Sequence, residues 1–182
     1  ALEGNLIILD RTAFYAEGGG QPPDLGRIIA FEGSCDVVDV EKVRDVVLHR
    51  VEGTIPKVGA MVHCQVDADR RHSLRRSHTS THIVNGSARA VLGNHVWQTG
   101  AQKGVAESRL DITHYNSLDE EETHEIEQRA NDLAMKALPV KVEYLDRTEA
   151  EKRYGFRIYQ GGVVPSKTIR VVSVDDYEIE AC

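Results

Sequence analysis

Two histidines four residues apart, His78 and His82, are the residues best suited to chemistry in this sequence. The segment around them has a helical period, and residues four apart on a helix lie on one face, one turn from each other. Two imidazoles placed in this way can bind one metal ion. Because no Glu follows His78, the segment is not the His-Glu-x-x-His of a metalloprotease. The same spacing also suits histidines that cap or pack a helix.

The final residue, Cys182, is a further candidate metal ligand, at the end of a predicted strand. Thiolate together with imidazole is the usual zinc-binding set in reducing compartments. Only three cysteines occur in the chain, which argues against a disulfide framework. The alternative is that Cys182 is a small apolar residue at a strand end, as we expect Cys35 and Cys64 to be within a core.

A glycine-rich segment, Thr12 to Gln21, contains the next candidates: Gly18, Gly19, Gly20 and Gln21. Consecutive glycines let the main chain approach a ligand closely, and their amides can form an anion-binding nest. A plain hairpin loop is the alternative. Gln98, in a more apolar setting, can hold a substrate amide, a water or an ester carbonyl, although such a residue is also often simply exposed.

A basic cluster precedes the histidine pair. It consists of Arg70, Arg71, Arg75 and Arg76. The net charge of −7 argues against a general nucleic-acid coat protein, but a local basic patch can still contact phosphates. A solvated helix face is the alternative.

The pattern of elements predicts an α+β chain of two parts. Residues 1–67 show short apolar or alternating runs between turn residues, which is typical of a small antiparallel barrel or sandwich, and we expect a small N-terminal antiparallel β-barrel. Residues 68–182 predict helices packed on a mostly antiparallel sheet: a helix from Ala68 to Leu92, a second with a capping box at Ser117 and Glu120, and a third near Thr148. We expect the strands of this second part at 140–144, 169–174 and 177–180.

The bulk composition predicts a soluble, cytoplasmic chain. Hydrophobic residues make up 41% of the sequence, which is enough for a packed core. We find no apolar run near the ~20 residues that span a bilayer. The sequence begins with Ala rather than Met, and we expect it to be part of a longer protein.

Taken in order, these segments resemble the editing domain of alanyl-tRNA synthetase and its free-standing relatives, the AlaX proteins. The resemblance spans nearly the whole chain and includes an archaeal-type block near Tyr154. The segments that carry it are Thr12–Gln21, Arg76–His82, His95–Gly100, Arg109–His114, Tyr154–Gly162 and Val171–Cys182.

This resemblance implies an aminoacyl-tRNA deacylase that hydrolyses the ester of Ser-tRNA(Ala), and also of Gly-tRNA(Ala), at the tRNA(Ala) acceptor end. It also implies a zinc ion, for which His78, His82 and Cys182 match three of the family's four ligands. The fourth would lie four residues beyond Cys182. The metal would either activate water or anchor the substrate, and the sequence leaves both open.

The resemblance also implies roles for individual residues. Thr12 matches a position suited to reading the serine hydroxyl, and Gln98 matches a position that lines the site. The glycines and Gln21 would contact the acceptor end, and the four arginines its phosphates.

Three alternatives remain at this point. The chain would be a threonyl-type editing domain, a zinc-stabilised tRNA-binding module without catalysis, or an inert fragment. The glycine-rich segment favours the alanyl type.

Overall fold

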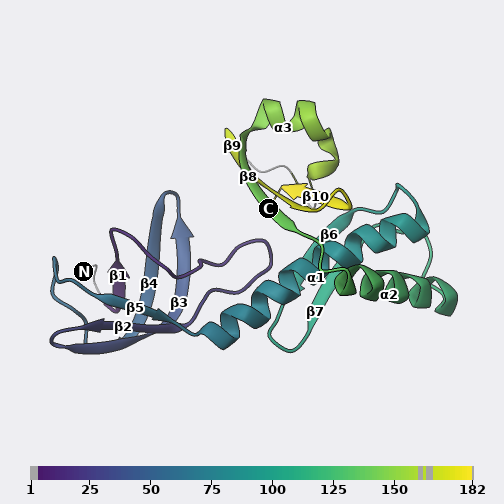
Figure 1. Ribbon diagram of the computed structural model, residues 1–182. Coiled ribbons are helices and arrows are strands. Elements are labelled where there is room, and N and C mark those ends of the chain that lie inside the picture. Colours follow the sequence, from purple (N-terminus) through teal and green to yellow (C-terminus); the bar gives the residue numbers. More distant parts are fainter. Residues whose placement is uncertain (1–3, 160–161, 163–165, 182) are drawn as a thin grey trace. The chain divides into compact units, whose positions relative to one another are not determined.

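The computed structural model describes residues 4–159, 162 and 166–181 and shows an α+β chain (Figure 1). Contacts divide the chain into two compact units. Unit 1 comprises Ala1–Arg76 and Lys103–Ala106, and unit 2 comprises Ser77–Gln102 and Glu107–Cys182.

Unit 1 is built on one five-stranded antiparallel sheet. Its strands are β1 (Leu6–Ile8), β2 (Gly26–Ala30), β3 (Gly33–Val43), β4 (Val46–Gly53) and β5 (His63–Val66). They pair in the order β1-β4-β3-β2-β5, and a register shift between Val37 and Asp39 marks an irregularity in β3. Within the described residues β1 and β5 are the two edges of this sheet, so the predicted closed barrel is not confirmed.

The core of unit 1 is apolar. Alternate residues of the strands point to one side of the sheet, as the two-residue period of a strand requires. Burying each such side chain contributes about 1.5–3 kcal/mol to folding. Cys35 lies in this core and Cys64 packs against it, as the sequence predicts. The buried members are Ile7, Phe14, Ile28, Cys35, Val37, Val40 and Val51.

The long helix α1 (Ala68–Leu92) has the bounds predicted from the sequence. Asp67 precedes it, and its side chain accepts a hydrogen bond from the Arg70 amide at 3.0 Å, as an N-cap residue does. At the other end, Gly93 has a φ of 113°, which only glycine adopts without strain, and its amide donates to the Arg89 carbonyl. Residues through Arg76 belong to unit 1 and the rest to unit 2.

Unit 2 contains two further helices and two small sheets. The hairpin of β6 (Gln98–Lys103) and β7 (Ser108–Ile112) was not predicted from the sequence. An antiparallel sheet has the order β10-β9-β8, with β8 (Val140–Asp146), β9 (Thr168–Val174) and β10 (Glu178–Ala181). The helices are α2 (Glu120–Met135) and α3 (Arg147–Tyr154), and the 3-10 turn η1 (Phe156–Ile158) follows α3.

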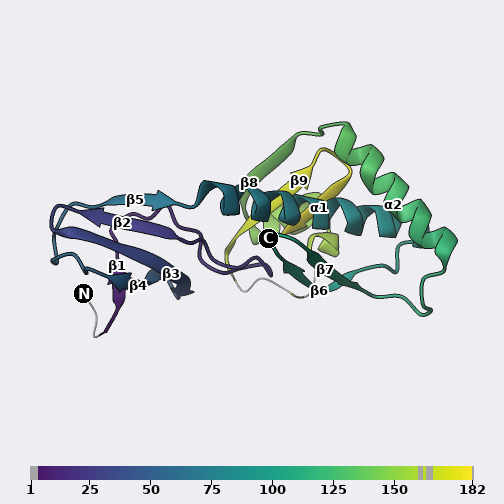
Figure 2. The same cartoon turned by 90° about the horizontal axis from the view of Figure 1, so that it is seen from below.

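Helix α2 packs along the second half of α1 (Figure 2). Ala130 meets Ile83 and β9 Val174 in one cluster, and Ile126 meets Ala88 in another. The predicted helix is therefore present, but its capping box is not at Ser117. Asp119 is the N-cap and pairs with Glu122. Two overlapping motifs stand in the sequence, and the chain uses the second, because Asp caps a helix as well as Ser does.

Strand β10 has two different faces. Ile179 and Ala181 pack against an apolar cluster that includes Ile158, Ile169 and Val171. The alternate residues of the strand are both glutamates, and both are buried. Among the described residues, no helix combines the length and the apolar character needed to cross a membrane.

Candidate functional site

Polar side chains on one face of α1 meet the two buried glutamates of β10. These side chains belong to His82, Asn85 and Arg89, which are three and four residues apart and therefore share one helix face. The Glu178 and Glu180 side chains are both 3% exposed or less. Ionisable groups are seldom buried this deeply unless they are paired, so both glutamates of this α1–β10 layer require hydrogen-bonding partners.

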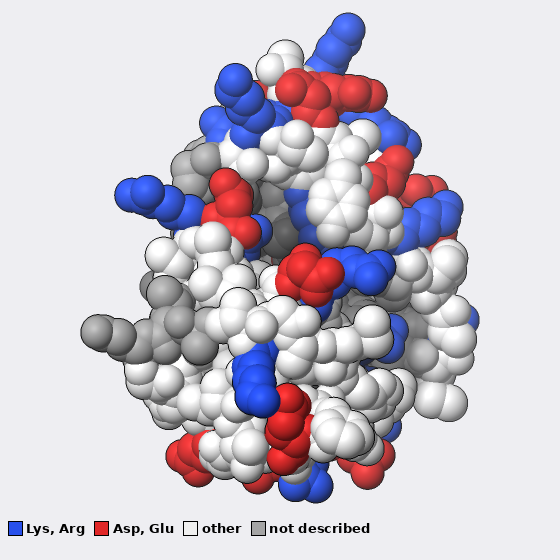
Figure 3. Space-filling model, turned by 90° about the vertical axis from the view of Figure 1, so that its left-hand side faces the viewer, with Lys and Arg blue, Asp and Glu red and all other residues white. Residues whose placement is uncertain are grey.

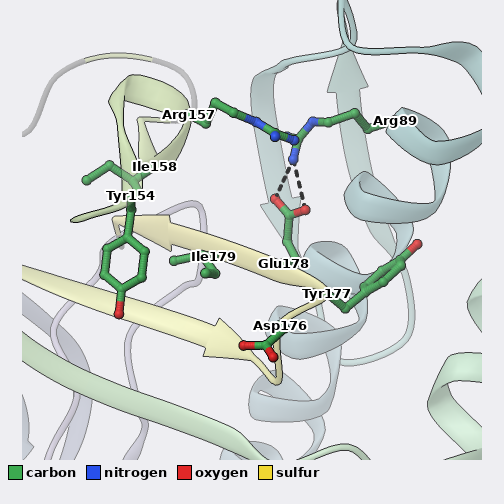
Figure 4. A pocket seen from close by; sticks show the side chains of 8 residues that line it. All are labelled: Arg89, Tyr154, Arg157, Ile158, Asp176, Tyr177, Glu178 and Ile179. Carbon is green, nitrogen blue, oxygen red and sulfur yellow. Dashed lines mark hydrogen bonds and ion pairs between the residues drawn. The ribbon is translucent and has the colours of Figure 1, made fainter. Parts of the chain in front are cut away.

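Each glutamate is held by hydrogen bonds from α1. Glu180 lies 2.7 Å from Nδ1 of His82 and accepts a hydrogen bond from Nδ2 of Asn85 at 3.0 Å. Arg89 donates from Nη1 to both carboxylate oxygens of Glu178, at 2.9 and 3.0 Å (Figure 4). A cavity of about 140 Å³ adjoins this second pair, between Arg89, Arg157 and Tyr154.

The two carboxyl groups have opposite titration behaviour. Burial raises the pKa of Glu178 to about 7, although the Arg89 guanidinium acts in the other direction. Burial also disfavours ionisation of Glu180, but hydrogen bonds and charge from His82, with the Asn85 amide, lower its pKa below the ordinary value. Glu180 is therefore the carboxylate that keeps its charge beside the histidine.

The contact with Glu180 sets the chemistry of His82. When Nδ1 of a neutral ring donates to a carboxylate, the lone pair lies on Nε2, which is the atom that a metal binds. Carboxylate partners of this kind are typical of metal-binding histidines. The His78 ring stacks on the His82 ring with centroids 5.2 Å apart and planes within 3°. The histidine pair and its carboxylate thus fit a zinc site.

The remaining predicted ligand, Cys182, lies outside the described residues. Among the residues that are described, no group of three His, Cys, Asp or Glu side chains is arranged to hold a metal. The zinc site therefore stays a prediction.

A glycine lets α1 come this close to β10. A Cβ atom built on Gly86 would lie 2.7 Å from the Tyr177 ring and 2.9 Å from Oε2 of Glu178. A residue with a Cβ atom at this position would therefore force the Tyr177 and Glu178 side chains to shift. Tyr177 adds a further link, because its hydroxyl donates to the Ser87 hydroxyl at 3.1 Å.

In unit 1, Thr12 is exposed and bonded to a residue that the sequence did not single out. Its Oγ1 lies 2.7 Å from Nε2 of His49 and accepts from the Phe14 amide at 3.1 Å. His49 is fully buried on β4, where its ring meets Phe14 edge to face at 5.6 Å. The sequence suggested only a surface or structural role for His49.

The glycine segment forms a tight turn. The amides and carbonyls of Gly18 and Gln21 pair at 2.9 and 3.1 Å, and Gly19 and Gly20 between them have φ values of 57° and 74°. Such a turn needs positive φ at both central positions. Lys103, which is buried, donates from its backbone amide to Gly20 and from Nζ to Gly19.

The four arginines occupy different environments. Arg71 donates from Nε to both oxygens of the buried Asp24 at 2.9 Å, and from Nη2 to the Ala13 carbonyl at 2.8 Å. The hydrogen bond to Asp24 raises the pKa of Arg71. Arg70 donates to the Pro23 carbonyl, whereas Arg75 and Arg76 are exposed. On the face in Figure 3, basic and acidic side chains are interspersed.

Gln98, the last predicted site residue, begins β6 in unit 2 and is half-buried. The predicted site residues therefore fall into two sets. His78, His82 and Gln98 lie in unit 2, and Thr12, the glycine turn and the four arginines lie in unit 1.

Known proteins resemble both units. The family model for class II (A) tRNA synthetases matches residues 1–70. An alanine–tRNA ligase of Methanopyrus kandleri is 52% identical over 176 residues, which is 97% of this chain and 19% of the relative. The ligase of Nitrosopumilus maritimus is 52% identical over 98% of this chain and 20% of the relative. The ligase of Pyrobaculum calidifontis is 49% identical over 100% of this chain and 21% of the relative.

The chain belongs to the alanine–tRNA ligase family. It spans about a fifth of the length of these relatives. The family resemblance inferred from the sequence motifs is thereby confirmed.

Sequence reasoning missed the residues that hold the site residues in place. Glu180 contacts His82 and is itself held by Asn85. His49 contacts Thr12, and Asp24 contacts Arg71. One signal was available for the glutamates: they alternate with apolar residues in a strand that leads to Cys182. Polar residues that alternate with apolar residues in a strand predict a solvent-exposed face, so the sequence does not reveal that these glutamates are buried.

Proposed function

We propose that this alanine–tRNA ligase segment is an editing module that hydrolyses the aminoacyl ester of Ser-tRNA(Ala) and of Gly-tRNA(Ala). The observation that supports it best is the buried pair of His82 and Glu180, because this carboxylate prepares the imidazole for a metal. The partners in this proposal are the acceptor end of tRNA(Ala) and the rest of the synthetase. The proposed location is the cytoplasm.

The contacts between α1 and β10 follow a regular register. Arg89 meets Glu178, and His82 and Asn85 meet Glu180, so contacts move back along α1 as β10 advances. Two strand residues advance about 6.6 Å, which equals four to five helix residues. This register brings His82 to Glu180. The family resemblance implies His78, His82 and Cys182 as ligands, and we therefore propose these three residues as the zinc ligands.

A physical need for editing follows from the substrates. A pocket that accepts alanine has little means to reject glycine, and an added hydroxyl changes binding by only ~1–3 kcal/mol. A second site that hydrogen-bonds the serine hydroxyl discriminates more strongly, because alanine leaves a polar group of that site unpaired. Thr12 is our candidate for this recognition of serine. Glycine has no hydroxyl, so its removal needs a different explanation.

Residues of the chain have the following proposed roles in ester hydrolysis. Zn²⁺, when bound, would supply Lewis-acid and electrostatic stabilisation at the ester. Gln98 would position the substrate or a water. The glycine turn would approach the terminal nucleotide, and the exposed Arg75 and Arg76 would contact phosphates. Gln21 was also predicted to contact the substrate, but its side chain is buried, so we assign it the shaping of the turn. Arg70 and Arg71 have carbonyl or carboxylate partners in unit 1, so we assign them the positioning of the glycine segment.

Deacylation of Ser-tRNA(Ala) tests the proposal. The chain should be compared with a version extended beyond Cys182 that restores the fourth family ligand. We expect His78→Ala and His82→Ala in the extended chain to lower the rate constant at least 100-fold. His72→Ala, an exposed histidine of the same helix, is the matched control and should stay within twofold. Equal rates for all three variants would contradict the proposal.

A carboxylate variant and chelation sharpen this experiment. Replacing an outer-shell partner lowers metal affinity by about 10–100-fold, which is the loss expected for Glu180→Gln. Chelation should abolish deacylation while far-ultraviolet circular dichroism stays unchanged. Unfolding on chelation would instead indicate a zinc-stabilised binding module. Faster hydrolysis of Ser-tRNA(Thr) than of Ser-tRNA(Ala) would indicate the threonyl type.

A further inference from the structure

We infer that His49 fixes the Thr12 hydroxyl as a hydrogen-bond acceptor, so that Thr12 recognises aminoacyl groups that carry a side-chain hydroxyl. The inference rests on the proposed editing function and adds a positioning residue to it. It also predicts which partner donates in the recognition step: the substrate hydroxyl donates and Thr12 accepts.

The contacts of His49 define its tautomer. Its Nδ1 lies 3.1 Å from the carbonyl oxygen of Ile7. A carbonyl oxygen can only accept, so Nδ1 carries the proton. The ring is fully buried between Ile7 and Phe14, and burial lowers its pKa, which keeps it neutral near pH 7. In a neutral ring protonated at Nδ1, Nε2 is an acceptor.

The tautomer of His49 defines the direction of its hydrogen bond with Thr12. Because Nε2 of His49 accepts, the Thr12 hydroxyl must donate across the 2.7 Å that separates them. Oγ1 also accepts from the Phe14 amide at 3.1 Å. A hydroxyl has one donor and two acceptor positions, so one lone pair of Oγ1 is left. Thr12 is exposed, so a ligand can reach it.

The consequence is a selective contact. A serine side chain can donate its hydroxyl proton to this lone pair. Alanine and glycine cannot, and a ligand that offers only an acceptor would meet two facing lone pairs. The geometry is held from both sides, because the Arg71 side chain donates to the carbonyl of Ala13, next to Thr12. His49 thereby acts through Thr12 and does not need to touch the substrate.

The test compares two substrates in the same variant, in the extended chain used above. We expect His49→Phe, which keeps a ring in the core but has no acceptor, to lower the ratio of Ser-tRNA(Ala) to Gly-tRNA(Ala) deacylation rates about tenfold. The loss of one hydrogen bond to the substrate corresponds to a factor of this size. Thr12→Val should lower the ratio at least as far.

Two further variants separate positioning from folding. His49→Gln offers an amide oxygen to Thr12. Its ratio of Ser-tRNA(Ala) to Gly-tRNA(Ala) deacylation rates should be at least about threefold higher than that of His49→Phe, which is half of the tenfold loss on a logarithmic scale. The double variant Thr12→Val with His49→Phe should lose no more than Thr12→Val alone, because both changes remove one contact. His63→Phe, at an exposed histidine of β5, is the control.

The outcomes are distinguishable. A parallel fall in both deacylation rates with an unchanged ratio would mean that His49 is only structural, and the inference would be wrong. Additive losses in the double variant would also overturn it. If the unsubstituted chain hydrolysed neither substrate, the proposed function itself would fail. In that case the substitutions would have no activity to change.

Discussion

The two units of this chain use polar groups in different ways. In unit 1, an apolar sheet core carries a single neutral imidazole, His49, and the ion pair of Asp24 with Arg71 fastens the glycine segment to α1. In unit 2, α1 meets β10 through two buried glutamates and their partners. A core built from apolar contacts is sufficient for folding, whereas buried ion pairs contribute little net stability. The α1–β10 layer is therefore the part of the molecule whose residue types need a functional explanation.

The largest effect is expected where both partners are buried. Arg89→Ala removes both guanidinium hydrogen bonds from the Glu178 carboxyl in a desolvated position, which should lower the free energy of unfolding by about 3–5 kcal/mol. Urea denaturation measures this. Replacing the pair together, with Arg89→Met and Glu178→Leu, should recover most of the loss, because an apolar pair of similar volume needs no desolvation of charge. If the double variant is as unstable as Arg89→Ala, the contrast between the units is wrong.

The ion pair in unit 1 should have the next largest effect. Its arginine side chain is 30% exposed while Asp24 is 1% exposed, so Arg71→Ala leaves one buried charge that water can partly reach. We expect the free energy of unfolding to fall by about 3 kcal/mol, which is the lower end of the range for breaking a buried ion pair. Arg75→Ala, at an exposed position of the same helix, should change stability by less than about 0.5 kcal/mol. Similar values for the two variants would mean that the Asp24 pair does not fasten the segment.

The close approach of α1 and β10 predicts that Gly86→Ala lowers the stability of the chain, whereas the same substitution in other helices usually raises it. Gly to Ala in a helix interior normally stabilises it by about 0.5–1 kcal/mol. At Gly86 the added methyl group would meet the Tyr177 ring, so we expect destabilisation of about 1–3 kcal/mol instead. Thermal melting compares Gly86→Ala with the parent chain. A higher melting temperature would show that α1 and β10 do not approach as closely as described.

The smallest effect concerns the pH dependence of unit 1. Burial lowers the pKa of His49, against the opposite effect of its bond to the Ile7 carbonyl. The folded chain then binds fewer protons at this site than the unfolded chain does. The His49 contribution to stability is therefore complete above pH 6.5 and is lost as the pH falls through the folded-state pKa, by at most about 1.4 kcal/mol per pH unit.

Urea denaturation between pH 7.5 and 5 tests this. The stability of the parent chain minus that of His49→Phe should fall with pH in this window. A difference that does not change with pH would mean that His49 is not buried in its neutral form.

Several features followed from local sequence. Helix α1 was predicted with its observed bounds, because the apolar period and the stop at Gly93 lie within the same stretch of chain. The strands expected at 140–144, 169–174 and 177–180 were found as β8, β9 and β10. The cap of α2 was misplaced by two residues, because Ser117 and Asp119 both begin an acceptable motif. The β6–β7 hairpin was missed, because its residues are mostly polar or small.

The sequence by itself therefore determined the helices, most strands and the family, together with His78 and His82 as neighbours on one face. These depend on residues close in the chain. Only the tertiary structure decided what the site residues contact. Glu180 is 95 residues from Asn85, and His49 is 37 residues from Thr12. A glutamate or histidine has no local pattern that reveals burial, since its pairing depends on which distant element folds against it.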